Sequence, residues 1–174
     1  MKKSLMLPIA VSVTVTVAYV VSTFLFMQGL PAHLATHFDA TGRPNGWMTK
    51  AETIRFDLLM GLGMQALLIL LFSIMRFIPA RFVNMPHKDY WQKPENFRTA
   101  CTYLARYALW LGSLMLLWMI LLNYQVAEAN RALLPHLDPS GFVVAMSTFA
   151  AMLVIWFICV WRQFRVPAET TKAR

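Results

Sequence analysis

The chain has 174 residues, of which 58% are hydrophobic and 14% are charged, and its formal net charge is +8. Ordinary soluble domains carry about 25% charged residues, so this composition excludes a typical soluble domain and indicates an integral membrane protein. The excess of Lys and Arg follows from membrane topology, and it gives no reason to expect a nucleic-acid partner.

Four apolar runs are each long enough to cross a bilayer, which takes about 20 residues. They cover residues 6–30, 58–78, 105–124 and 142–161. Little chain remains outside them, so the sequence predicts an all-α membrane protein with a single four-helix transmembrane domain over residues 1–174. The first run is too long for the apolar region of a cleavable signal peptide, and we expect it to be retained as an anchor.

The distribution of Lys and Arg predicts the orientation of these spans. With the N-terminus in the cytoplasm, twelve of the sixteen Lys and Arg residues fall inside, and four fall outside: Arg43, Lys50, Arg55 and Arg131. This bias places both termini in the cytoplasm. Cys101 and Cys159 then lie on the reducing side, and we expect no disulfide between them.

The first outer loop, residues 31–54, is rich in residues that form turns. Residues 39–42 predict a turn with Gly42 at positive φ, and residues 43–46 predict a second turn. Thr49 and Glu52 predict a capping box at the start of the next helix. We therefore expect an ordered loop between the first two helices.

Histidines in the outer loops raise the question of a metal site. A short helix over residues 32–38 would place His33 and His37 four residues apart on one face, which is the spacing of paired zinc-binding histidines. His136 from the second outer loop could add a ligand, since zinc takes four N, O or S ligands. No Glu stands between the first two histidines and the loops contain no Cys, so a role as polar interfacial residues is the simpler interpretation, and no cofactor is expected.

The spans and the remaining loops give further expectations. No acidic residue or Lys is predicted near the bilayer centre, which argues against a proton-coupled transporter, and Asp57 is placed at the outer mouth of the second span. Gly61 and Gly63 permit close helix packing. The sequence at residues 138–141 predicts a helix start, and the inner loop at 79–104, rich in Pro and aromatic residues, predicts an ordered segment along the membrane surface.

Two blocks of the sequence resemble the family called domain of unknown function 1648. The first runs from Leu30 to Lys50 and the second from Met85 to Arg98, and the similarity covers about residues 15–100. Ala35 stands where members of the family usually carry Pro, and His87 stands where Asn is frequent.

This resemblance implies a small multi-pass protein of the bacterial inner membrane, related to the N-terminal part of SdpI-type immunity proteins. Those proteins protect a producing cell from a secreted antimicrobial peptide. We therefore predict a non-enzymatic membrane protein that recognises a peptide or a partner protein, with SdpI-like immunity as its most specific form. The alternatives are an accessory subunit of a larger membrane complex and a membrane-embedded metal-dependent hydrolase. Besides the lipid bilayer, a second copy of the chain is a further candidate partner.

Aromatic residues and Arg in a preformed loop are typical of binding hot spots. On this ground the predicted contacts in the outer loop are His37, Phe38, Asp39, Gly42, Arg43, Asn45, Trp47 and Lys50. In the inner loop they are Pro86, Lys88, Asp89, Tyr90, Trp91, Pro94, Glu95 and Arg98. A purely structural chain reversal is the alternative for the outer loop. For the inner loop it is an interfacial belt, with Tyr90 and Trp91 at headgroup depth.

Overall fold

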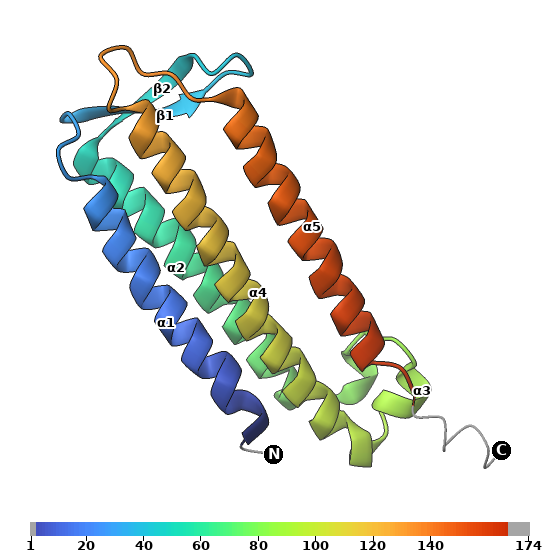
Figure 1. Cartoon of the computed structure of the whole chain (residues 1–174). Coiled ribbons are helices and arrows are strands. Elements are labelled where there is room, and N and C mark those ends of the chain that lie inside the picture. The colour runs from blue at the N-terminus through green and yellow to red at the C-terminus, as the bar shows by residue number, and fades with distance from the viewer. Residues whose placement is uncertain (1–2, 167–174) are drawn as a thin grey trace.

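The computed structural model describes residues 3–166. Four long helices run up and down between the two ends of the molecule (Figure 1): α1 (Lys3–Phe26), α2 (Lys50–Ile74), α4 (Pro94–Ala129) and α5 (Pro139–Gln163). Each is long and apolar enough to cross a membrane, which confirms the four predicted spans as helices. The helices extend beyond most of the predicted limits, because polar turns continue past the apolar runs.

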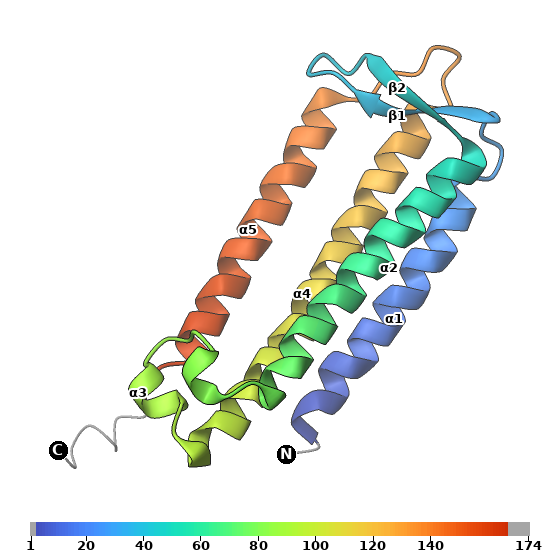
Figure 2. The same ribbon diagram turned by 180° about the vertical axis from the view of Figure 1, so that it is seen from behind.

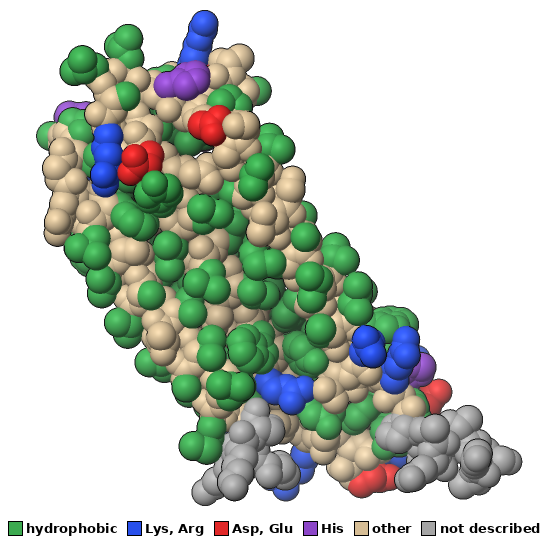
Figure 3. Space-filling view, in the orientation of Figure 1, with side chains coloured by type: hydrophobic (Ala, Val, Ile, Leu, Met, Phe, Trp, Pro, Cys, Tyr) green, Lys and Arg blue, Asp and Glu red, His purple; other side chains and the backbone are tan. Residues whose placement is uncertain are grey.

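Helices α1, α2 and α4 form a packed group, whereas α5 packs mainly on α4, as both views show (Figures 1 and 2). Val15, Tyr19 and Leu116 are buried at the centre of the three-helix group. On α5 the one fully buried residue is Ala145. All four helices carry exposed apolar side chains, which suit contact with a lipid bilayer. Figure 3 shows such side chains spread along the length of one face of the molecule.

Small residues allow the three helices to approach closely. This confirms the prediction for Gly61 but not for Gly63, where an added Cβ atom would meet nothing within 4 Å. A Cβ atom at Gly61 would come within 2.5 Å of the Tyr19 ring, and one at Gly112 would come within 2.9 Å of the Gln65 side chain. Gln65 also accepts a hydrogen bond from Thr16 and donates one to Ser12. Such hydrogen bonds satisfy polar groups that would otherwise be unpaired inside the membrane.

A two-stranded antiparallel hairpin joins α1 to α2, formed by β1 (His33–Phe38) and β2 (Pro44–Thr49). The chain is mostly helical, as predicted, but it also contains this hairpin. Residues 32–38, considered as a short helix, contain β1, and the second turn predicted at residues 43–46 was wrong because β2 begins at Pro44. Leu34 and Ala35 of the first strand are completely buried. Leu34 packs in a cluster with Ala127 of α4, so residues far along the chain hold this strand in place. The register shifts at His37 and again at Phe38, so the paired ladder is bulged there.

The predicted helix starts are confirmed. Thr49 and Glu52 form a capping box at the start of α2, and Asp138 accepts hydrogen bonds from the backbone N–H groups of Ser140 and Gly141 at the start of α5. Helix α1 ends at Phe26, before the predicted limit, and the chain turns through Gly29 with φ of +73°.

The opposite end of the molecule holds three short helices: η1 (Met75–Phe77), η2 (Ala80–Phe82) and α3 (Lys88–Trp91). Figure 1 shows that α3 lies near the last turn of α5, and that the described chain begins and ends at this side. We call this side the α3 end and the other the hairpin end. Basic side chains stand out at the α3 end (Figure 3).

Candidate functional site at the hairpin end

The tip of the hairpin is a turn built around one carboxylate. Asp39 Oδ1 accepts hydrogen bonds from the hydroxyl and the N–H of Thr41 and from the N–H of Arg43. Donation from the Thr41 hydroxyl and then from the Arg43 N–H lowers the pKa of Asp39 below its ordinary value. Gly42 has φ of +83° and donates its N–H to the Asp39 carbonyl, which confirms the turn predicted at residues 39–42.

The turn lies against the segment that connects α4 to α5. The backbone N–H of Leu137 donates to the Gly42 carbonyl at 2.9 Å. A Cβ atom at Gly42 would come within 2.1 Å of the Leu137 carbonyl oxygen and 3.0 Å of the His136 ring. Glycine is therefore required at this position both by its φ and by the space available.

The hairpin is also attached to the end of α4. The side chain of Asn130, which is 3% exposed, accepts a hydrogen bond from the N–H of Ala35 and donates one to its carbonyl, each at 2.8 Å. The two polar backbone groups of a buried strand residue are thus satisfied by one side chain. These contacts hold the hairpin against the end of α4 and the segment that connects α4 to α5.

A pocket of about 560 Å³ lies between the hairpin, α4 and α5. The hairpin contributes the segment from Thr36 to Ala40 together with Gly42. The helices and their connection contribute mostly apolar residues, which are Leu122, Gln125, Val126, Leu137, Pro139, Phe142 and Val143. The volume is within the range of small-ligand sites, and the mixture of apolar walls with a polar rim suits an amphipathic ligand.

Residues 14–60, which include the whole hairpin, match the family model described as Domain of unknown function (DUF1648). This segment of the chain is similar to the DUF1648 family. No curated protein and no solved structure is significantly similar to it. The matched DUF1648 segment ends within α2, so the walls that α4 and α5 give to the pocket lie outside it, and so does the block at residues 85–98.

The predicted contacts of the outer loop divide into two groups within the DUF1648 segment. His37, Phe38, Asp39 and Gly42 line the pocket. The other four, Arg43, Asn45, Trp47 and Lys50, belong to the tip, to β2 and to the start of α2, outside the set that lines it. Trp47 is 55% exposed, and Asn45 pairs with His37 through their side chains.

The three histidines proposed as metal ligands do not come together. His33 and His37 lie on a strand, where residues four apart are separated by about 13 Å along the chain, instead of one helical turn. His136 lies beside the turn, where a Cβ atom at Gly42 would come within 3.0 Å of its ring. Within residues 3–166, no three His, Cys, Asp or Glu side chains gather in an arrangement that could hold a metal ion, and the metal-dependent hydrolase has no geometric support.

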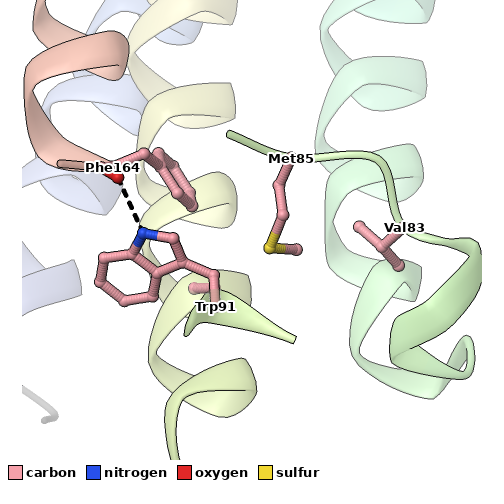
Figure 4. Close-up of a cluster of buried hydrophobic side chains, with 5 residues drawn as sticks. Val83, Met85, Trp91 and Phe164 are labelled. Atoms are coloured by element: carbon pink, nitrogen blue, oxygen red, sulfur yellow. Dashed lines mark hydrogen bonds between the residues drawn. The ribbon is translucent and has the colours of Figure 1, made fainter. Parts of the chain in front are cut away.

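The predicted contacts of the inner loop also divide between buried and exposed positions. Trp91 is buried with Val83, Met85, Ala100 and Phe164, and its indole N–H donates to the Phe164 carbonyl at 2.8 Å (Figure 4). It therefore fastens the end of α5 to the loop. Tyr90 and Pro86 are half-buried, whereas Lys88, Asp89, Pro94, Glu95 and Arg98 are exposed.

Sequence reasoning missed two features of this molecule. Leu122, Phe142 and Val143 line the pocket, but within apolar runs they carry no signal that separates them from lipid-facing residues. Asp57, expected at the mouth of a span, is 9% exposed in the packed group of three helices, where its backbone carbonyl accepts a hydrogen bond from the Tyr19 hydroxyl. Its charge was visible in the sequence, but its burial depends on packing against α1 and α4.

Proposed function

We propose that this protein is a non-enzymatic membrane protein that binds an amphipathic peptide segment at the hairpin end. The observation that carries the proposal is the pocket itself, because four of the eight contacts predicted from the outer loop line it together with apolar side chains of two helices. An apolar side chain of a peptide would enter between α4 and α5. Its backbone and polar groups would remain at the level of His37 and Asp39.

We propose that the hairpin end faces the outside of a bacterial inner membrane and that both termini are cytoplasmic. The Lys and Arg bias supports this orientation, since these residues favour the cytoplasmic side. A peptide secreted by the same or a neighbouring cell would then reach the pocket directly. SdpI-like immunity, in which binding protects the cell from an antimicrobial peptide, is the specific form that the family resemblance implies.

The test places a photo-crosslinking amino acid at Val143 in intact cells and identifies the adducts by mass spectrometry. The peptide identified is then synthesised and titrated against the purified protein. We expect Val143→Trp, which fills the pocket, to weaken binding by about tenfold, because the entering side chain loses its burial. Val154→Trp is the matched control, since both valines lie on α5 and are 60% and 58% exposed, and Val154 lies outside this pocket.

Two outcomes would contradict the proposal. Adducts formed with lipids alone at Val143 would identify the pocket as part of the lipid-facing surface. Equal weakening by the two Trp variants would show that the peptide binds elsewhere or that α5 is perturbed as a whole. In either case the hairpin would remain a structural chain reversal.

A role as accessory subunit of a larger membrane complex is the second candidate. The observation that favours it is the apolar pair Leu133 and Leu134, which are 102% and 84% exposed in the connection between α4 and α5. Exposed apolar groups at a tip outside the spans are typical of protein contacts. Mild detergent purification of the wild type and of the Leu133→Ser, Leu134→Ser variant tests it: loss of a stoichiometric partner supports this role, and the absence of any partner contradicts it.

A further inference from the structure

A second pocket of about 560 Å³ lies at the α3 end, far from the hairpin. Leu5 of α1, Phe72 and Ser73 of α2, and Phe77 of η1 form part of its wall. The rest comes mainly from the first turns of α4. The pocket thus opens where the described spans end, at the depth of lipid headgroups.

Two arginines from different elements line this pocket. Arg76 belongs to η1 and Arg98 to α4. Within residues 3–166 the one ion pair joins Arg131 to Glu128, so no described carboxylate lies within 4.0 Å of either of these arginines. Arg76 stacks on the ring of Phe77 at 4.6 Å. Both positive charges therefore remain available for an anion.

The chemistry of this group of side chains fits a phosphate. The planar guanidinium presents donors that match phosphate oxygens in pairs, and Ser73 adds a hydroxyl group to the same pocket. Thr102 also lines the pocket, but its hydroxyl donates to the Arg98 carbonyl. A free phosphate would need only the polar part of the site. The apolar wall from Leu5, Phe72 and Phe77 instead suits a phosphate that carries acyl chains.

We propose that this pocket binds the phosphate of an anionic phospholipid headgroup, with Arg76 and Arg98 as its ligands. The site is separate from the hairpin-end pocket and does not depend on the function proposed above. It would tie η1 to the start of α4 through a lipid and so position the loop that contains Trp91. It is also more specific than a general attraction between basic residues and an anionic membrane.

The test measures phospholipid binding to the purified protein by native mass spectrometry, with phosphatidylglycerol and phosphatidylcholine compared at equal concentration. We expect a preference for phosphatidylglycerol in the wild type and a loss of about tenfold or more in its affinity in the Arg76→Gln, Arg98→Gln double variant, because charge-assisted hydrogen bonds are lost. Both arginines are exposed, so the variants are expected to fold, which thermal unfolding checks.

Arg81→Gln is the matched control. Arg81 stacks on Phe82 at 4.8 Å, much as Arg76 stacks on Phe77, but it lies on η2 and outside the residues that line this pocket. We expect this variant to bind phosphatidylglycerol as the wild type does. An equal loss of phosphatidylglycerol affinity in Arg81→Gln would show that the lipid is attracted by basic residues in general. Unchanged affinity in the double variant would show that Arg76 and Arg98 do not bind the lipid. Either result would overturn the proposal.

A competition experiment distinguishes a site for a phospholipid from a site for a free phosphate. Inorganic phosphate and glycerol phosphate are added in competition with phosphatidylglycerol. Weak competition supports a lipid site, because these soluble ions lack the acyl chains that the apolar wall would contact. Competition at the same concentration as the lipid itself would overturn the lipid assignment and leave a soluble phosphate site.

Discussion

Asn130 and Ala35, which are ninety-five residues apart, are joined by two hydrogen bonds of 2.8 Å between the side-chain amide of one and the backbone of the other. The amide of Asn130 takes the place of a third strand at the free edge of β1. Its Nδ2 also donates to the Val126 carbonyl within α4. One side chain thus links the DUF1648 hairpin to a helix outside the matched segment.

Replacing Asn130 by Leu should release the hairpin from α4. The N–H and carbonyl of Ala35 would lose their partners while buried, at a cost of about 1–3 kcal/mol for each group. We expect faster hydrogen exchange over β1 and a lower unfolding temperature. Gln28→Leu, at an exposed position, is the control. Unchanged exchange in Asn130→Leu would mean that water replaces the amide without loss.

This contact also explains one departure from the family pattern. A Pro at position 35 has no N–H to donate to Asn130, so Ala is suited to this position in this chain. The sequence pattern alone could flag the position. The reason for the difference depends on a residue at the far end of α4, which only the structure brings near.

Features that depend on neighbours in the chain could be predicted from the sequence. The capping box of Thr49 and Glu52, the turn at residues 39–42 and the Asp138 cap each involve residues within four positions of one another. The spans follow from the apolar runs. By contrast, β2 begins with Pro44, Asn45 and Gly46, which have low strand propensity and form a strand because β1 lies beside them.

The second departure from the family pattern is tested at His87. This residue has φ of +50° and ψ of +49°, in the left-handed region that Asn and Gly adopt more easily than most residues. We expect His87→Asn to retain the stability of the wild type and His87→Val to lose about 1–2 kcal/mol. Thermal unfolding followed by tryptophan fluorescence measures both. Lys88→Val is the control in ordinary helical backbone, and an equal loss there would contradict the conformational explanation.

Two glycines of α2 allow the effect of helix packing on stability to be measured apart from the effect of helix propensity. A Cβ atom at Gly61 would come within 2.5 Å of the Tyr19 ring, whereas a Cβ at Gly63 would meet nothing within 4 Å. Gly63→Ala should therefore stabilise the helix by up to about 1 kcal/mol, as Ala is the better helix former. Gly61→Ala should destabilise the protein despite the same gain. Unfolding in detergent measures the pair, and stabilisation by both changes would show that Tyr19 moves away freely.

A similar pair tests the docking of the hairpin turn. Gly42 and Gly29 have φ of +83° and +73°, but a Cβ at Gly42 would meet the Leu137 carbonyl oxygen and one at Gly29 would meet nothing within 4 Å. Both Ala variants carry the cost of positive φ, about 1–2 kcal/mol. The additional loss in Gly42→Ala, measured by thermal unfolding, reports the contact with Leu137. Equal losses would show that the turn is not held against the connection.

The hairpin turn should also respond to acid. The pKa of Asp39 is lowered in the folded protein, chiefly by the Thr41 hydroxyl, below the value of about 3.9 expected in an unfolded chain. The ionised carboxylate therefore stabilises the turn above about pH 4, and this contribution is lost as the pH falls through the folded pKa. The amide of Arg43, which donates to this carboxylate, should then exchange faster. Thr41→Val removes the main donor, so the same loss should begin at higher pH. If the transition in Thr41→Val coincides with that of the wild type, the hydroxyl does not set the pKa.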